Sequence, residues 1–406
     1  MTAAAGRARP HALILSGSVG KGHDTVAEAC AEALQTIGVE TDTVDCMHML
    51  GPISGRISDG VFRSLIAVPG LYDAFHFTQL RGGTGLVDAM DRAASAKLAE
   101  PLRRLVEDRS AELIISVFAT GAGAVDRLKR FGMPRLRSIV YCTDAVPHRL
   151  WVHPNTDLFL VTDQVSAAFV RSHRPDAQIR VIPAAARPEF DSAPSRADAR
   201  DGLGVPAGAT CALLMAGSWG LARLDRIADA LAADGFVVLA VAGTNQRLAK
   251  RLRALAASRR GLVAFGFTPR IPELMSAADV VITTPGDTCT EARLLGRPLL
   301  LLDTIPGHGR ENLQLELTRG RVAATVSRPS TVVAAARRLL QEVASAPPTP
   351  HVGGREWRQA FIAAISSERL PTTIGRAVAE GPPPARPRRE RPAASASPKR
   401  RRSRTR

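Results

Sequence analysis

Residues 13–24 read Leu-Ile-Leu-Ser-Gly-Ser-Val-Gly-Lys-Gly-His-Asp, and the fold of the chain is decided around them. A short apolar run ends in a turn with three glycines, and a helical pattern of small residues begins at Thr25. This order is typical of a strand, a glycine loop and a helix start. Glycine reaches positive φ and has no side chain, so a ligand can approach the backbone of this loop closely.

His23 stands at the rim of the loop. Imidazole is the side chain best suited to proton transfer near neutral pH, and the helix start beside it offers unpaired N–H groups. The loop is not a Walker A motif, which needs four residues between its glycines and Ser or Thr after the Lys. Its spacing also differs from the dinucleotide fingerprint G-x-G-x-x-G. A tight turn with a solvated histidine is the alternative interpretation of these residues.

The length and the charge of the chain bound its organisation. A chain of 406 residues exceeds one ordinary core, so we expect two domains and a tail. Of the net charge of +16, residues 381–406 contribute +9, which leaves a modestly basic body. This last segment is rich in Pro, Arg and Ser and is predicted to be disordered. It could bind nucleic acid or anionic lipid, or serve only solubility.

Five scattered cysteines, with no C-x-x-C pair, argue against a disulfide framework or a zinc site and for a reducing compartment. The apolar residues 12–15 are too few for a signal sequence, and no run of 18 apolar residues occurs. We therefore expect a soluble protein, or at most a membrane-associated one.

Short β-rich runs alternate with helical patterns in two series, which predicts an α/β protein with parallel sheets. The first series has strands at residues 12–15, 41–45, 112–117 and 138–142, and the second at 211–216, 236–242, 262–265, 280–283 and 299–303. We expect an N-terminal domain over residues 11–185, a linker over 186–206 and a C-terminal domain over 207–346. A helix over residues 355–370 is expected to return to the N-terminal domain.

Residues 46–84 interrupt the first series with a crowd of apolar and aromatic side chains and three arginines. An apolar helical stripe is usually part of a core, so this segment is predicted to pack inside its domain. Alternatively, it presents an apolar and basic surface to lipid.

Small or polar residues follow four strands of the second series, at 215–220, 242–245, 265–268 and 283–288. The carboxyl ends of parallel strands share one edge, where ligands bind. Backbone N–H groups after Gly217 and Gly286 suit a diphosphate, and Glu291 suits a ribose diol. A nucleotide site facing a base across a cleft suggests group transfer from a nucleotide-activated donor. The candidate donor-binding residues here are Gly217, Ser218, Gly243, Asn245, Phe267, Gly286, Asp287, Thr288 and Glu291.

Several of these stretches resemble motifs of the monogalactosyldiacylglycerol synthase and diacylglycerol glucosyltransferase family, with more distant similarity to the MurG-type glycosyltransferases. The matching motifs lie at residues 16–24, 69–78, 143–157, 266–268, 275–279, 285–292 and 306–312. The resemblance implies a GT-B fold, in which two Rossmann-like, doubly wound domains face a cleft. It further implies a nucleotide-sugar donor, usually UDP-linked, and inverting transfer of a hexose to a lipid hydroxyl such as that of diacylglycerol.

By the same resemblance His23 is the general base, and Asp144 orients His23 or the acceptor. The implied acceptor-binding residues are Gly20, Gly22, Tyr72, Phe75, His148 and Trp151, and His308 and Asn312 join the donor site. No metal and no cofactor beyond the nucleotide-sugar is implied, since helix ends and N–H groups can carry the leaving-group charge. The expected location is the cytoplasmic face of the cell membrane, with peripheral attachment to anionic lipid; nucleic acid would bind only through the tail.

The chain departs from the family pattern at the donor site. Lys-Pro-Gly-Gly becomes Thr-Pro-Gly-Asp at residues 284–287, and Pro-Gly-Gln-Glu-Glu-x-Asn becomes Pro-Gly-His-Gly-Arg-Glu-Asn at 306–312. These changes leave the donor sugar open. Three alternative functions also stay open: transfer to a non-lipid acceptor, epimerisation of a UDP-sugar, and a nucleic-acid-binding or scaffold role through the basic tail.

Overall fold

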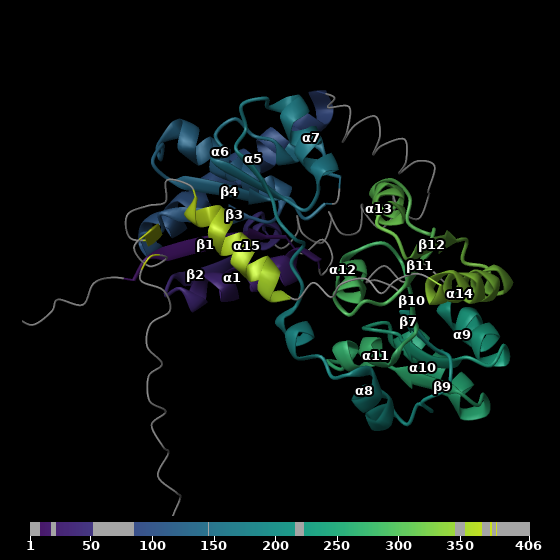
Figure 1. Cartoon of the computed structure of the whole chain (residues 1–406). Coiled ribbons are helices and arrows are strands. Elements are labelled where there is room, and N and C mark those ends of the chain that lie inside the picture. The colour runs from purple at the N-terminus through teal and green to yellow at the C-terminus, as the bar shows by residue number, and fades with distance from the viewer. Residues whose placement is uncertain are drawn as a thin grey trace, which may run out of the picture.

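The computed structural model describes residues 9–17, 22–51, 85–144, 146–215, 223–345, 354–367, 374–375 and 379. These residues form two α/β domains, each built on a six-stranded parallel sheet with helices around it (Figure 1). The doubly wound α/β architecture predicted from the sequence is confirmed. The expected disordered tail, residues 381–406, lies outside the described residues.

The sheet of the N-terminal domain has the strand order β2-β1-β3-β4-β5-β6. Its strands are β1 (His11–Ser16), β2 (Glu40–Asp45), β3 (Leu113–Ser116), β4 (Arg137–Tyr141), β5 (Leu158–Val161) and β6 (Ile179–Val181). The helical elements between them are α1 (Gly22–Thr36), α2 (Cys46–Met49), α5 (Gly85–Arg109), α6 (Ala119–Phe131), the 3₁₀ turn η2 (Arg149–Trp151) and α7 (Gln164–His173). The order reverses between β1 and β3, and ligands bind at such a switch point, beyond the carboxyl ends of the strands.

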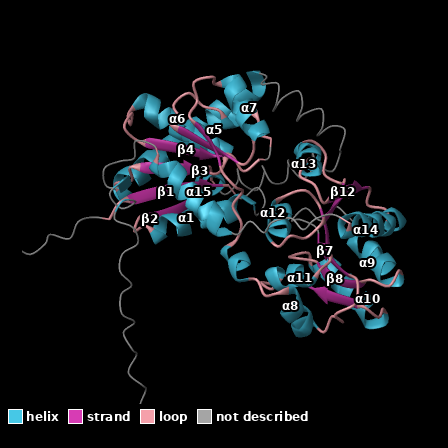
Figure 2. Cartoon of the chain, viewed as in Figure 1, coloured by secondary structure: helices cyan, strands magenta, loops and turns pink. Residues whose placement is uncertain are grey.

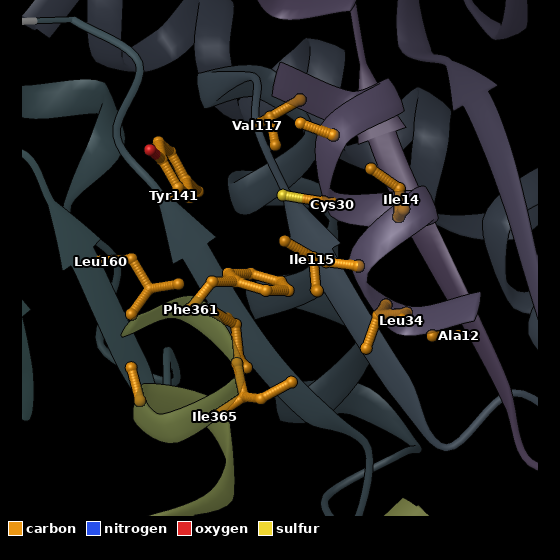
Figure 3. Close-up of a cluster of buried hydrophobic side chains, with 14 of the residues drawn as sticks. Ala12, Ile14, Cys30, Leu34, Ile115, Val117, Tyr141, Leu160, Phe361 and Ile365 are labelled. Carbon is orange, nitrogen blue, oxygen red and sulfur yellow. The ribbon is translucent and has the colours of Figure 1, made fainter. Parts of the chain in front are cut away.

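Both faces of this sheet are buried, which is why its central strands are apolar without interruption. Ala12 and Ile14 pack with α1 on one face, in the cluster drawn in Figure 3, whereas Leu13 and Leu15 pack with α5 and α6 on the other. At the end of β1 a Cβ on Gly17 would lie 2.6 Å from the ring of Phe118. Gly17 therefore lets Phe118, just before α6, lie against the end of β1.

The C-terminal sheet has the order β12-β11-β10-β7-β8-β9, with its switch point between β7 and β10. Its strands are β7 (Cys211–Met215), β8 (Val237–Val241), β9 (Leu262–Phe265), β10 (Val280–Thr283), β11 (Leu299–Leu302) and β12 (Val322–Thr325). Its helices are α9 (Leu224–Ala233), α10 (Gln246–Ser258), α11 (Ile271–Ala277), α12 (Asp287–Leu294), α13 (His308–Leu317) and α14 (Pro329–Ala344). Figure 2 shows the strands enclosed by these helices.

The stretch expected as a linker, residues 186–206, is structured. It contains the 3₁₀ turn η3 (Pro188–Ser192) and the helix α8 (Arg196–Leu203). Helix α8 packs on α11, and its buried Arg200 is held by Asp279 at 2.8 Å. Most of the expected linker is therefore part of the C-terminal domain. Its Ala, Pro and Asp content did not signal this, because Ala277 and Asp279, which bind Arg200, lie 77 and 79 residues away along the chain.

The last helix, α15 (Gly354–Ser366), packs against the N-terminal domain. Trp357 and Phe361 are buried and stack on one another, with 5.1 Å between ring centroids. The indole N–H of Trp357 donates to the hydroxyl of Tyr141 at 3.1 Å. Burying two such rings contributes about 1.5–3 kcal/mol each, which holds the returning helix on the sheet.

Three strands were not predicted from the sequence: the edge strands β6 and β12 and the inner strand β5. The edge strands β6 and β12 have three and four residues and are only partly buried, so their apolar pattern is weak. The inner strand β5 is fully buried, and its continuous apolar sequence Leu-Phe-Leu-Val is the pattern that would have predicted it. Of residues 46–84, Cys46, Met47 and Leu50 are core, as predicted, and residues 52–84 lie outside the described residues.

Helices α5 and α6 cross closely at Gly123, whose Cβ position lies 3.3 Å from a carboxylate oxygen of Asp91. Burial, with Asp88 adding to it and Arg149 opposing it, raises the pKa of Asp91 to about 7. The folded pKa exceeds that of an unfolded aspartate, so the folded state binds the extra proton and loses stability as the pH rises from about 4 to about 7.

We expect Asp91→Asn to increase the free energy of unfolding at pH 8 by about 2 kcal/mol, since the full shift is discounted for partial exposure. The gain should shrink towards pH 4. Urea denaturation followed by circular dichroism at both pH values measures it, with Asp108→Asn on the exposed side of the same helix as the control. A gain that is the same at pH 4 and pH 8 would contradict this assignment.

Candidate active site at the domain interface

The switch point of the N-terminal sheet holds His23 in the first turn of α1. The helix begins at Gly22, three residues earlier than the pattern predicted, so His23 is a helical residue rather than part of the loop. Behind it, Ser16 at the end of β1 donates from its hydroxyl to Asp24 at 2.9 Å. This bond ties the start of α1 to the strand and fixes the direction in which His23 projects.

The ring of His23 is held by its Nδ1 atom. Nδ1 lies 2.8 Å from the carbonyl oxygen of Val117, just after β3, and 3.0 Å from the hydroxyl of Thr143, just after β4. A carbonyl only accepts, so Nδ1 carries the proton of the neutral ring and donates it to Val117. The lone pair of the neutral imidazole is then on Nε2, where a base needs it.

Aromatic rings surround the imidazole. Phe118 meets it edge-on with 5.1 Å between centroids, and Trp151 lies 6.4 Å away. Trp151 is buried and donates its indole N–H to Asp144 at 2.7 Å, and His148 Nε2 lies 3.6 Å from the same carboxylate. Of the expected residues after β4, Asp144, His148 and Trp151 therefore form one cluster beside His23.

The ring hydrogen bonds of His23 to described residues go to Val117 and Thr143, not to Asp144. Asp144 contacts Trp151 and His148 instead, so any part it has in orienting His23 stays a prediction. Its expected role toward an acceptor stays a prediction. Thr143 belonged to the quoted motif but was given no role, and Val117 acts through its backbone, which carries no sequence signal.

At the facing edge of the C-terminal sheet, Gly286 ends the turn after β10 and Asp287 begins α12. Glu291 lies one turn further on and is only 4% exposed. Burial raises the pKa of the Glu291 carboxyl, and Arg187 opposes this shift by donating from Nε to Oε1 at 2.7 Å. Arg187 comes from the segment between the sheets, 104 residues away along the chain, and sequence reasoning assigned it no role.

Asp287 reaches the N-terminal domain. Its Oδ2 atom lies 2.7 Å from the position that a Cβ on Gly22 would take, so a larger residue at position 22 would require the carboxylate to move. Burial raises the pKa of Asp287, and His23 and then Arg187 oppose the rise. Another contact joins the domains where Arg319, after α13, lies 3.5 Å from Asp163, the cap of α7.

The remaining donor candidates lie along the same C-terminal sheet edge. Phe267, after β9, is 74% exposed, and Gly243 adopts a positive φ of 55° after β8. Asn245 caps α10, since its side-chain oxygen accepts from the N–H of Leu248 at 3.0 Å. Thr288 lies in the first turn of α12 and Asn312 in α13, both partly buried.

Several predicted residues fall where the structure gives no description. Gly20, Tyr72, Phe75, Gly217 and Ser218 lie outside the described residues, as does the side chain of His308. Over the described ranges, no three His, Cys, Asp or Glu side chains gather as a potential metal site.

Comparison with known proteins adds a family to this geometry. Residues 23–182 match the family described as monogalactosyldiacylglycerol (MGDG) synthase. The chain resembles this family. The match begins at His23 and covers the N-terminal domain up to the end of β6, and the resemblance predicted from the sequence motifs is confirmed.

Among curated relatives, the processive diacylglycerol beta-glucosyltransferase of Bacillus subtilis is 26% identical over 338 residues, which cover 81% of this chain and 87% of the relative. Among solved structures, MurG of Acinetobacter baumannii superposes with a TM-score of 0.54 at 14% identity, over 91% of this chain and 98% of the other. UDP-GlcNAc 2-epimerase from Neisseria meningitidis gives 0.53 at 11%, over 88% and 100%. The structures share the GT-B fold, and the relatives support assignment as a glycosyltransferase.

Proposed function

We propose that this chain transfers a hexose from a UDP-sugar to the free hydroxyl of diacylglycerol, with inversion at the anomeric carbon and with His23 as the general base. The relatives named as diacylglycerol glucosyltransferases supply the acceptor class and the reaction type. The observation that carries the proposal is the hydrogen bond between His23 Nδ1 and the Val117 carbonyl, which leaves the lone pair on Nε2.

In the proposed reaction the acceptor hydroxyl gives its proton to Nε2 while its oxygen attacks the anomeric carbon of the sugar. The bond from that carbon to the diphosphate oxygen breaks, and UDP leaves with the electron pair. Attack from the face opposite the leaving group inverts the configuration. The base and the leaving group must then stand on opposite sides of the sugar, which suits a base on one domain and a diphosphate pocket on the other.

The donor end of the proposal rests on α12. Its first turn offers N–H groups at the positive end of the helix dipole, which stabilise a departing diphosphate. Glu291, one turn in, would accept hydrogen bonds from the ribose diol. In this structure Arg187 uses one of its oxygens, so a ribose must share Glu291 with Arg187 or displace it.

We expect Glu291→Ala to weaken UDP binding by about 10- to 100-fold, because a hydrogen bond to a charged group contributes about 1.5–3 kcal/mol. Isothermal titration of UDP measures the loss, and inorganic pyrophosphate, which has no ribose, is the control ligand. Equal UDP affinity for both proteins would rule Glu291 out as the ribose ligand.

The function is tested by incubating the purified chain with each of several UDP-hexoses and with diacylglycerol in anionic vesicles, and by reading hexosyl-diacylglycerol by mass spectrometry. The expected product has the β-configuration when the donor is α-linked, which proton NMR coupling constants report. UDP-sugar without lipid is the matched control. A changed sugar nucleotide in that control, with no lipid product, would favour an epimerase, and a product only with a water-soluble acceptor would replace the lipid.

The proposed place of action is the anionic inner face of the cell membrane. In the described parts of the chain, no helix is both long and apolar enough to span a bilayer. Attachment would use the basic residues 381–406, the apolar and basic residues 46–84, or both. Co-sedimentation with anionic vesicles tests this attachment, and a chain that lacks residues 381–406 shows which of the two segments is responsible. If the same variant loses nucleic-acid binding but keeps transferase activity, any nucleic-acid role is limited to the tail.

A further inference from the structure

Asp287 is an anionic side chain at a place where the proposed reaction has no use for an anion on the donor side. The donor diphosphate carries negative charge, and a carboxylate beside it is repulsive. The carboxylate of Asp287 lies instead against Gly22, at the start of the helix that carries His23. Burial raises the pKa of Asp287, and His23 and then Arg187 oppose that rise.

His23 lacks a carboxylate partner from its own domain among the described residues. Its Nδ1 is held by the Val117 carbonyl and the Thr143 hydroxyl, which are uncharged. The neighbouring Asp24 on α1 accepts from Ser16. The rings that contact the imidazole, Phe118 and Trp151, bring no charge.

Two other charged side chains around this site, Asp144 and Arg187, already have partners. Asp144, after β4, is engaged by Trp151 and lies 3.6 Å from His148 Nε2. Arg187, from the segment between the sheets, is held by Glu291. Asp287 on α12 comes from the opposite domain, and its carboxylate lies at Gly22, the residue before His23.

We propose that Asp287 is a positioning residue for His23, which supplies from the C-terminal domain the negative charge that stabilises the imidazolium formed when Nε2 takes the acceptor proton. This inference rests on the proposed function. In serine-protease chemistry a carboxylate on the base's own domain performs this task. Here the base is complete only when the two domains meet at Gly22 and Asp287, so proton abstraction is coupled to domain contact.

The first test is Asp287→Asn, which keeps the shape of the side chain and removes its charge. We expect kcat to fall about 3-fold and the acidic midpoint of the pH profile of kcat to move lower by about half a pH unit, as expected for loss of one through-space charge. The dissociation constant of UDP should change little. In a His23→Ala background the same substitution should cause no further loss. Glu189→Gln, an exposed acid near Arg187, is the matched control and should leave the profile in place.

The second variant is Gly22→Ala, which places a methyl group where the carboxylate oxygen of Asp287 lies. It should reproduce the lower kcat and the shifted midpoint without touching the acid itself, and it keeps the inference testable if Asp287→Asn folds poorly. An unmoved pH profile with a higher KM for the donor would overturn the inference and assign Asp287 to the donor sugar. Tighter UDP binding with an unmoved profile would overturn it too, and would make Asp287 only a repulsive neighbour of the diphosphate.

A readout without transfer separates this inference from the proposed function. Diethyl pyrocarbonate acylates neutral imidazole, and peptide mass spectrometry measures the rate at His23 alone as the pH is varied. The midpoint of that rate should move lower by about half a pH unit in Asp287→Asn. If the wild-type chain forms no glycolipid and the midpoint still moves, the proposed function fails and the pairing stands; if glycolipid forms and the midpoint does not move, the pairing fails alone.

Discussion

His23→Ala is expected to lower kcat by about 10²- to 10⁴-fold, the usual contribution of a positioned general base. Without Nε2, the acceptor hydroxyl must lose its proton to water, while the donor site on the other domain stays intact. UDP affinity should therefore change by less than about 2-fold, because His23 is not asked to bind the nucleotide. The loss should appear in kcat rather than in the KM of the donor.

The measurement is single-turnover formation of hexosyl-diacylglycerol, with UDP titrated separately. His173→Ala, an exposed histidine on α7, is the control for a generic effect of losing an imidazole. Turnover equal to that of the wild type would remove His23 from the mechanism, and with it the proposed geometry of attack.

Arg200→Ala is expected to destabilise the C-terminal domain by about 3–5 kcal/mol, the cost of breaking a buried ion pair from one side. Arg200 is 2% exposed and donates to Asp279 at 2.8 Å and to the carbonyls of Ala277 and Ala207 at 3.0 and 2.6 Å. These bonds hold α8 against the end of α11 and against Asp279, just before β10. Their loss leaves several buried acceptors without a donor.

Arg196→Ala is the matched control, because Arg196 pairs with the same Asp279 from a position that is 44% exposed. An exposed ion pair contributes less than about 1 kcal/mol, so this variant should unfold close to the wild type. Denaturant unfolding followed by circular dichroism compares the two. A difference of less than 1 kcal/mol between them would show that burial of Arg200 is not what holds α8.

The fold could be predicted largely from local pattern. Buried strands of a parallel sheet are continuous apolar runs, and glycine turns mark their carboxyl ends, so residues 12–15, 262–265 and 280–283 were recognisable without any partner. His23 was recognisable in the same way, because a histidine after a glycine loop and before a helix is already at a sheet edge. The weak edge strands β6 and β12 were missed since partial exposure blurs their pattern.

What the sequence determined by itself is therefore the alternation of elements, the two glycine-loop edges and the chemical types available at them. Only the tertiary structure decided which groups meet: Thr143 with His23 over 120 residues, Arg187 with Glu291 over 104, and Asp287 with Gly22 across the domain interface. Local pattern depends on the backbone within a few residues, whereas these contacts depend on how distant elements and the two domains are placed against one another. Tertiary packing therefore decides how the imidazole of His23 is oriented, that Arg187 binds Glu291, and that Asp287 contacts the N-terminal domain. No periodicity in the sequence encodes these contacts.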